Sequence, residues 1–197
     1  MLELLNPEYR FSSLTKISPE WLKQHRYRVL LMDIDNTLLP RNSTVVPEQH
    51  LAWIQRLQRH GIALVIASNN GGKRISEIEK QLAENGLHVP VLTWAGKPFP
   101  RAYAGAIRLL EESFPSVSGG SAICPACILA VGDQIFTDVL GAHWYHLPVV
   151  LLRPLSGNDF AGTKVLRMLE SWVKWYLLKR RLLPEEDKVE TRQPREK

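Results

Sequence analysis

Two aspartates directly follow a short apolar run near the start of the chain. Asp33 and Asp35 come after Val29–Met32, whose composition is that of a buried strand. Side chains along a strand alternate between its two sides, so residues two apart face the same way. Two carboxylates held this close need a cation or a shared proton to offset their repulsion. The pair therefore predicts a Mg2+ site in which one carboxylate acts as a nucleophile.

Predicted strands and helices alternate along the chain, and these elements must position the pair of aspartates. Apolar runs typical of buried strands cover residues 28–35, 63–69, 89–94, 127–133 and 148–153. Helical patterns lie among them at residues 47–61, 73–84, 101–112 and 138–146. This alternation predicts a three-layer, Rossmann-like α/β fold, in which helices cover a parallel sheet of about five strands.

Polar residues that do not suit a core fall at the ends of these runs. Besides the two aspartates, Ser68 lies at the end of the second run and Lys97 follows the third. Asp133 ends the fourth run, and Asp138 comes shortly after it. The C-terminal ends of parallel strands meet at one edge of a sheet, which is where ligands bind. The acids, a hydroxyl group and an ammonium group are therefore expected to converge there.

Taken in order, these motifs resemble those of the haloacid dehalogenase superfamily. The resemblance covers about residues 25–155 and is carried by Asp33-x-Asp35-x-Thr37, Ser68, Lys97 and Gly132-Asp133-x4-Asp138. Finer details are similar to the YqeG-type branch of subfamily IIIA, which is related to phosphatases of phosphatidylglycerophosphate. These details are the strings Ala67-Ser68-Asn69-Asn70 and Ala95-Gly96-Lys97-Pro98. The resemblance implies a Mg2+-dependent phosphomonoesterase that forms an aspartyl-phosphate.

The resemblance also implies catalytic roles for four residues. Asp33 would be the nucleophile. Asp35 would protonate the leaving oxygen and later activate a water molecule. Ser68 would hydrogen-bond a phosphoryl oxygen, and Lys97 would neutralise charge on the phosphate and on Asp33. Catalysis would then consist mainly of positioning and charge stabilisation.

The implied metal site draws on four aspartates. Asp33, Asp133 and the backbone carbonyl of Asp35 would bind Mg2+, which prefers hard oxygen ligands. Asp138 would complete this set from slightly further away by orienting the site. A simpler interpretation of Asp138 is that it caps the helix that begins beside it.

Simpler interpretations also stay open for the residues expected to bind substrate. Thr37 and Asn69 complete the substrate-binding set with Ser68 and Lys97, yet both could simply fix loops. Ser68 could be a turn residue, and Lys97 could be a solvated loop lysine.

The spacing of the motifs leaves no room for a cap domain over the site. The intervals from Asp35 to Ser68 and from Ser68 to Lys97 each already have to hold a helix and a strand. An uncovered site would accept a phosphate presented on a large or membrane-bound substrate, and the resemblance favours the phospholipid phosphatidylglycerophosphate. Two alternatives remain: a phosphatase of a small soluble phosphate ester, and a non-catalytic adaptor with the same fold.

The net charge of +5 is concentrated near the C-terminus. Residues 164–181 contain six Lys or Arg side chains and one Glu. At helical spacing, an apolar arc that includes Trp172 and Trp175 forms on this segment. Trp combined with Lys and Arg is typical of a helix that lies on an anionic membrane, here the inner face. The alternative is a helix packed on the sheet with a solvated basic side.

Four segments are therefore expected along the chain. Residues 1–24 should pack on a core formed by residues 25–155, a basic helix should occupy 156–183, and 184–197 should be disordered.

The remaining composition restricts the class of protein. Hydrophobic residues make up 45% and charged residues 23%, as in ordinary globular proteins, and such localised charge does not indicate nucleic-acid binding. The first ten residues lack the apolar stretch of a signal peptide, so a cytoplasmic protein is expected.

Cys124 and Cys127 are too few for a structural zinc site. They are interpreted as buried or loop thiols without a special role, and the alternative is a disulfide or a redox role.

Overall fold

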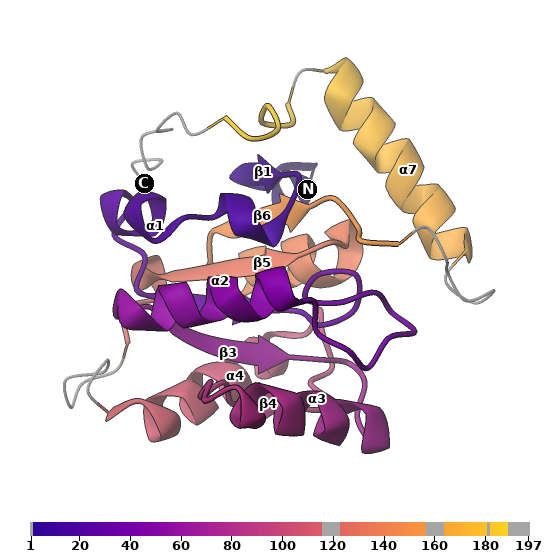
Figure 1. Cartoon of the computed structure of the whole chain (residues 1–197). Coiled ribbons are helices and arrows are strands. Elements are labelled where there is room, and N and C mark those ends of the chain that lie inside the picture. Colours follow the sequence, from indigo (N-terminus) through magenta and orange to yellow (C-terminus); the bar gives the residue numbers. More distant parts are fainter. Residues whose placement is uncertain (1, 116–122, 157–163, 181, 189–197) are drawn as a thin grey trace.

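A parallel six-stranded sheet forms the centre of the computed structural model, which describes residues 2–115, 123–156, 164–180 and 182–188 (Figure 1). The strand order is β1-β6-β5-β2-β3-β4. The strands are β1 (Tyr9–Phe11), β2 (Val29–Met32), β3 (Ala63–Ala67), β4 (Val91–Leu92), β5 (Ile128–Gly132) and β6 (Val149–Leu152). The α-helices are α1 (Pro19–Gln24), α2 (Glu48–Arg59), α3 (Lys73–Glu84), α4 (Pro100–Ser113), α6 (Leu140–Trp144) and α7 (Lys164–Lys179). Shorter helical turns are η1 (Leu2–Leu5), η2 (Leu14–Lys16), η3 (Pro125–Cys127) and the π-helical η4 (Ile135–Val139).

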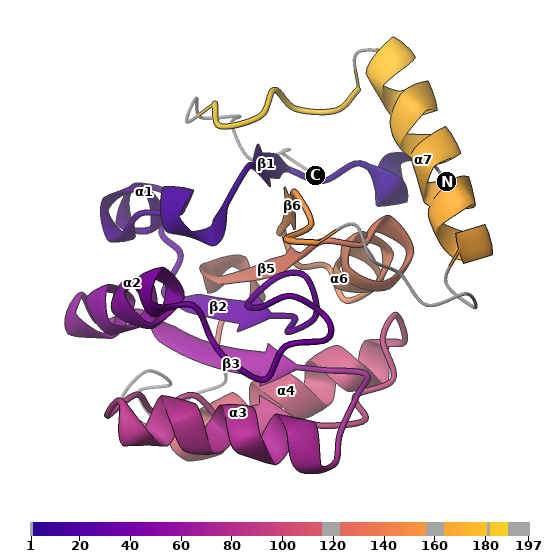
Figure 2. The same ribbon diagram turned by 45° about the vertical axis from the view of Figure 1, so that its right-hand side comes forward.

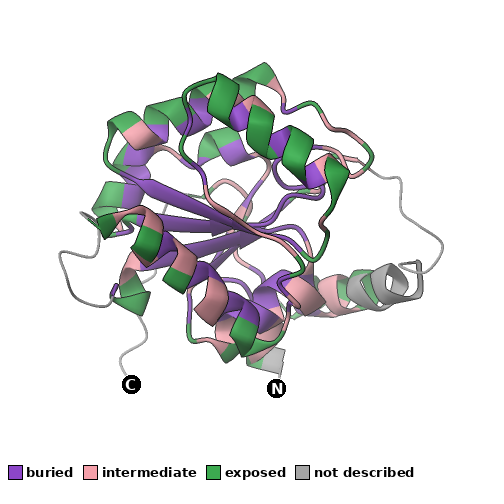
Figure 3. Cartoon of the chain, turned by 90° about the horizontal axis from the view of Figure 1, so that it is seen from below, coloured by how far each residue is buried: buried purple, intermediate pink, exposed green. Residues whose placement is uncertain are grey.

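Apolar residues on both sides of the central strands create two cores. In β2, Leu30 and Met32 belong to one core, whereas Val29 and Leu31 belong to the other. Helices α1, α2 and α3 supply apolar side chains to the first core, and α4 and α6 supply them to the second. Figure 3 shows the buried strands between helices whose outer surfaces are exposed. The predicted three-layer α/β fold is confirmed.

The sheet contains one more strand than the sequence predicted. Tyr9–Phe11 pairs in parallel with β6 at the register Tyr9 to Val150. A strand of three residues is too short to show the alternation on which a prediction depends. The predicted run at 89–94 also shrinks to Val91–Leu92. It cannot continue because Trp94 has a left-handed backbone, with a φ of 51°.

Two connections near the C-terminal edge of the sheet were the candidate positions for an inserted cap domain. Between β2 and β3 the chain forms a loop and α2, and between β3 and Lys97 it forms α3 and β4. All of these residues are described, and none of them forms a separate cap domain. The edge that carries the predicted site is therefore not covered by an inserted domain.

Helix α7 lies toward the end of the sheet to which the strands point (Figures 1 and 2). Val173 packs against the second core, and Leu177 is fully buried. The side chains of Trp172 and Trp175 are instead exposed, at 64% and 53%. The predicted apolar arc is thus divided, since one side of the helix packs on the domain and the other faces solvent. Side chains 164–170, which include part of that arc, lie outside the described residues.

The segment after α7 differs from the disorder expected from residue 184 onward. The carboxylate of Asp187 accepts hydrogen bonds from the backbone N–H of Ser12 at 2.9 Å and from its hydroxyl at 2.7 Å. Arg153 and Glu186 form an ion pair at 2.7 Å. Residues 184–188 therefore lie against β1 and the end of β6, because a few polar contacts hold them there. Residues 189–197 of the expected tail lie outside the described residues.

None of the helices in the described ranges has both the length and the apolar character needed to cross a membrane.

Candidate active site

Lys97 joins two aspartates that come from different strands. Its Nζ lies 2.6 Å from Oδ1 of Asp33, just after β2, and 2.8 Å from Oδ1 of Asp138, in η4 after β5. All three side chains are nearly inaccessible to solvent. Because charge-assisted bonds of this length are strong, they fix the position of both carboxylates relative to the lysine. The sequence expectation that Lys97 lies beside Asp33 therefore agrees with this geometry.

Burial and neighbouring charges set the ionisation of this group. Burial raises the pKa of Asp33 to about 6, and Asp138 adds to the rise while Lys97 opposes it. Burial acts to lower the pKa of Lys97, but the carboxylates of Asp138 and Asp33 outweigh it and raise that pKa above its ordinary value. Lys97 is therefore an ammonium group at neutral pH, and it favours the ionised form of the carboxylate that it contacts.

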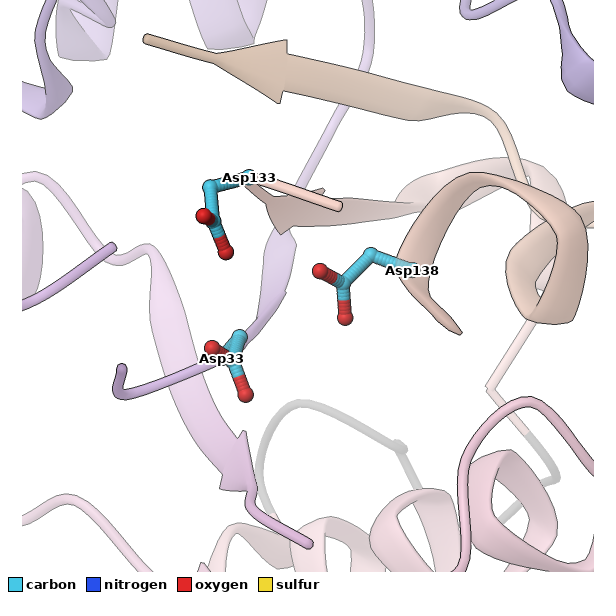
Figure 4. A group of neighbouring side chains, drawn as sticks. All are labelled: Asp33, Asp133 and Asp138. Atoms are coloured by element: carbon cyan, nitrogen blue, oxygen red, sulfur yellow. The ribbon is translucent and has the colours of Figure 1, made fainter. Parts of the chain in front are cut away.

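Asp133 completes a cluster of three carboxylates. Oxygens of Asp33, Asp133 and Asp138 lie within 4.8 Å of one another, and all three residues are buried. Figure 4 shows the three carboxylates directed toward a common space. The Lys97 ammonium contacts Asp33 and Asp138 in this cluster. Oxygen ligands and negative charge are what a hard divalent cation requires, and the residues fit such an ion.

The side chain of Asp35 is held by a different group of residues. One oxygen accepts a short hydrogen bond from Nδ2 of Asn70, and the other lies 2.9 Å from Nη2 of Arg74. Nε of Arg74 also donates to the backbone carbonyl of Ser43 at 2.9 Å. Asp35 thus stays outside the cluster of three carboxylates, which leaves only its backbone carbonyl for the metal role expected from the sequence. The Asp35 carboxylate is instead held by Asn70, just before α3, and by Arg74, in the first turn of α3.

Sequence reasoning missed Asn70 and Arg74 as site residues. Arg74 is in the first turn of α3, which follows Gly72 with a φ of 78°. That left-handed glycine turns the chain so that the helix starts beside the site. The only signal in the sequence was the position of Arg74, six residues beyond Ser68 and at the start of a helical pattern.

Replacing Arg74 with Gln should lower kcat about ten- to hundredfold while KM for substrate changes less, because Asp35 would lose the partner that orients it. Arg74→Lys should recover only part of the loss, since an ammonium group cannot contact Asp35 and Ser43 with the same planar geometry. Steady-state phosphate release would measure both constants. Lys73→Gln is the matched control, because the neighbouring Lys73 side chain is 93% exposed. Equal kcat for Arg74→Gln and the control would contradict the orienting role.

Ser68 and Asn69 occupy the turn between β3 and α3. Ser68 is buried, and its Oγ accepts a hydrogen bond from the backbone N–H of Asn70 at 3.1 Å. Oδ1 of Asn69 accepts from the backbone N–H of Gly96 at 3.0 Å and of Lys97 at 2.7 Å. Its Nδ2 donates to the carbonyl oxygen of Lys97 at 2.9 Å. The Asn69 side chain is therefore used to fix the loop of Lys97, which favours the loop-fixing interpretation over direct substrate contact.

Thr37 lies in the loop that follows the first two aspartates. It is buried, and within the described chain its hydroxyl has no hydrogen-bond partner. The preceding Asn36 has a left-handed backbone, with a φ of 60°, and its Oδ1 accepts a hydrogen bond from Ser156 at 2.6 Å. Thr37 therefore keeps a hydroxyl available beside the site, while Asn36 ties this loop to the segment after β6.

Cys124 directly precedes η3 and Cys127 is the last residue of η3, at the opposite end of β5 from the site, and both are free thiols. Cys124 is exposed and Cys127 is half-buried. They are therefore separated from the catalytic edge by the length of the strand.

The sequence matches known proteins over most of its length. Residues 2–155 match the family described as Mitochondrial PGP phosphatase. The chain belongs to this family. Probable phosphatase YqeG of Bacillus subtilis (strain 168) is 27% identical over 164 residues, which cover 83% of this chain and 86% of that protein. These matches confirm the resemblance to YqeG-type phosphatases, and the protein is a phosphoric monoester hydrolase.

A solved structure has the same fold as this PGP phosphatase family member. The crystal structure of a haloacid dehalogenase-like hydrolase from Brucella suis 1330 matches with a TM-score of 0.53 at 14% identity. The match covers 71% of this chain and 88% of that one. The haloacid dehalogenase fold expected from the sequence is thus confirmed.

Proposed function

We propose that this phosphatase hydrolyses the terminal phosphate of phosphatidylglycerophosphate through an aspartyl-phosphate, with Mg2+ as its metal ion. The observation that carries the proposal is the buried contact of Lys97 with Asp33 and Asp138 at the C-terminal edge of the sheet. This arrangement supplies a nucleophile, a cation for the phosphoryl oxygens and a cluster of acids for a metal. The description of the family supports the choice of substrate.

The first half of the reaction transfers the phosphoryl group to the protein. An oxygen of the Asp33 carboxylate attacks phosphorus, and the bond from phosphorus to the glycerol oxygen breaks. Asp35, in its protonated form, gives its proton to that leaving oxygen, so the oxygen departs as a hydroxyl group of phosphatidylglycerol. Lys97 stabilises the charge on the phosphoryl oxygens, and the Ser68 hydroxyl donates a hydrogen bond to one of them. Thr37 has a hydroxyl available for the same purpose.

The second half restores the protein. Asp35, now a carboxylate, takes a proton from water as the water oxygen attacks phosphorus. The bond between phosphorus and the Asp33 oxygen then breaks, which releases inorganic phosphate and returns Asp33 to its carboxylate form. Asn70 and Arg74 hold Asp35 in place through both steps, and Asn69 holds the loop that carries Lys97. Asp33, Asp133 and Asp138 would hold the Mg2+, which neutralises charge between the phosphate and these acids.

The choice between a lipid and a soluble ester rests on two further features. No inserted domain among the described residues covers the site, so none blocks a phosphate attached to a large body from approaching the C-terminal edge of the sheet. The exposed side of α7 carries Trp172, Trp175 and Leu178 together with Lys179. We propose that α7 rests on the inner face of an anionic membrane and that the enzyme is otherwise cytoplasmic.

Neutralising the basic end of α7 should weaken binding to anionic vesicles. Lys179 lies 4.9 Å from the ring of Trp175, and Arg180 lies 5.5 Å from the ring of Tyr176. Each of these cations is expected to contribute about 1 kcal/mol near an anionic surface. The double variant Lys179→Gln and Arg180→Gln should therefore bind about tenfold or more weakly at low salt. Arg181, which belonged to the predicted basic end, lies outside the described residues.

Vesicle co-sedimentation would measure this effect, and wild-type binding should fall as salt rises. The pair Lys80→Gln and Arg59→Gln is the matched control, since it removes the same charge from exposed positions on α3 and α2. Binding that is equally strong for both double variants at low salt would show that the end of α7 is an ordinary solvated surface.

The substrate itself is tested by phosphate release from phosphatidylglycerophosphate in mixed vesicles, compared with a panel of soluble phosphate monoesters. The lipid should have the highest kcat/KM. A soluble ester that exceeds the lipid would replace the proposed substrate and leave the phosphatase assignment intact.

A further inference from the structure

The loop that delivers Lys97 also presents two large aromatic side chains to solvent. This loop, residues 93–99, connects β4 to α4. Trp94 is 71% exposed and Phe99 is 56% exposed, whereas Lys97 between them is buried. Scattered apolar residues on a surface are ordinary, but two exposed aromatic rings on the loop of a catalytic lysine are a localised feature. Anything that contacts them comes to lie at the mouth of the active site.

The 93–99 loop is held firmly rather than loosely. The backbone N–H of Trp94 donates to the carbonyl of Asn70 at 3.3 Å, and that of Ala95 donates to the carbonyl of Ser68 at 2.9 Å. The side chain of Asn69 binds the loop at Gly96 and Lys97. The two aromatic side chains therefore project from a fixed support.

The backbone of Trp94 is also in an unfavourable conformation for a bulky residue. Its φ of 51° lies in the left-handed region, which glycine and asparagine adopt more easily. Its indole ring packs against the backbone of Gly71, where a Cβ atom would collide with it. A tryptophan that is strained and largely exposed contributes little to the stability of the fold, so a contact outside the domain is the better explanation for it.

The charges beside the aromatic rings are positive. The Arg101 guanidinium lies 5.6 Å from the centre of the Phe99 ring, and the exposed Lys73 begins α3 directly after the Gly71–Gly72 turn. Residues 93–101 contain no Asp or Glu. Aromatic rings combined with cations match an anionic lipid surface, where indole rings prefer the head-group region and cations attract the phosphates.

We propose that the 93–99 loop and Arg101 form a lipid-contacting rim that inserts Trp94 and Phe99 among the head groups of an anionic bilayer. The inference rests on the proposed lipid substrate and adds how that substrate is presented. The bilayer itself, rather than a cap domain, closes the site, and it brings a phospholipid phosphate toward Lys97. Helix α7 lies toward the same end of the sheet (Figures 1 and 2).

The double variant Trp94→Asn and Phe99→Ser tests the rim with little risk to the fold. Asparagine suits the left-handed backbone at position 94. Phe99 is the N-cap residue of α4 and makes no side-chain capping bond, whereas serine is a favoured N-cap. Trp144→Gln is the matched control, because Trp144 is also exposed but lies in α6, just before the chain enters β6 at the opposite edge of the sheet.

Two measurements are needed. The first is co-sedimentation with substrate-free vesicles of phosphatidylglycerol and phosphatidylcholine. The second is the ratio of phosphate release from phosphatidylglycerophosphate in such vesicles to release from p-nitrophenyl phosphate. For the double variant, both vesicle binding and this ratio should fall about tenfold or more, because the apolar area that enters the interface is removed. The Trp144→Gln control should match the wild type in both.

The outcomes separate this inference from the proposed function. If the double variant binds vesicles as tightly as the wild type and its ratio of lipid to soluble-ester hydrolysis is unchanged, the lipid-contacting rim is overturned while the lipid substrate stands. If the wild type hydrolyses only soluble esters, the proposed substrate fails, and substrate-free vesicle binding still decides the rim by itself. If the double variant loses activity on both substrates, the single variant Phe99→Ser replaces it in the test, because this variant leaves Trp94 in place. Its vesicle binding is then compared with that of the wild type. Binding equal to that of the wild type would again overturn the rim, as would binding that responds only to an added protein partner.

Discussion

Asp33→Asn is expected to lower phosphatase activity by about a thousandfold or more while the protein remains folded. The amide has nearly the same shape as the carboxylate, but it carries no negative charge and cannot attack phosphorus. The fold should tolerate the change because burial already disfavours the ionised form of Asp33. Lys97 also keeps its contact with Asp138 at 2.8 Å, so its ammonium group is not left without a carboxylate.

Phosphate release at saturating Mg2+ would measure the activity, and thermal unfolding would verify the fold. Glu77→Gln is the matched change from carboxylate to amide, since Glu77 is a partly exposed residue of α3. It should retain full activity. Activity of Asp33→Asn within about tenfold of the wild type would exclude Asp33 as the nucleophile.

The sequence alone was sufficient to predict that the acids meet at one edge of the sheet, because carboxylates are costly within a core. Carboxylates such as Asp33 and Asp133 are unfavourable directly after apolar strands unless something compensates them. Their position relative to one another then follows from the topology, since β2 and β5 are parallel neighbours with Met32 paired to Val131. Asp33 is the next residue after Met32, and Asp133 is the second residue after Val131, beyond Gly132. Strand pattern and pairing were therefore enough to place them together.

Contacts made by side chains from a helix terminus could not be predicted in the same way. Arg74 reaches Asp35 only because of the turn at Gly72 and the rotation of the first turn of α3. A shift of one residue at the start of the helix would turn Arg74 by about 100° and direct it elsewhere. The exact start of a helix is the least reliable part of a prediction made from sequence. The contact between Arg74 and Asp35 therefore depends on the exact start of α3, which the sequence pattern does not specify.

The division of α7 into packed and exposed sides was unpredictable for a related reason. Tryptophan and leucine both belong to an apolar arc, so hydrophobic spacing does not distinguish Leu177, which is buried, from Trp172 and Trp175, which are exposed. Which part of a wide arc packs on the domain depends on the shape of the receiving surface. The short strand β1 and the contacts of Asp187 with Ser12 depend on similar long-range pairing.

Removal of divalent ions should abolish activity, and Mg2+ should restore it. Three carboxylates within 4.8 Å of one another repel, and a divalent cation among them would offset that repulsion beyond what the Lys97 ammonium does. Ca2+ should bind but inhibit, because its longer and less regular coordination would misplace the nucleophile. Phosphate release in excess EDTA, followed by titration with each ion, measures this requirement. Full turnover in EDTA would contradict the assignment of the cluster to a metal.

Binding of the ion should also stabilise the folded protein, which gives a second readout that does not depend on turnover. A Mg2+ concentration of 100 times Kd would add about 2.7 kcal/mol to the free energy of unfolding. For a chain of this size, that corresponds to a rise in Tm of about 5–10 °C. Asp133→Asn removes one anionic ligand at nearly constant shape, so both the activating Mg2+ concentration and the concentration that raises Tm should increase together. Glu77→Gln again serves as the control with unchanged Mg2+ dependence. If Asp133→Asn responds to Mg2+ like the wild type in both measurements, Asp133 is not a ligand of the ion.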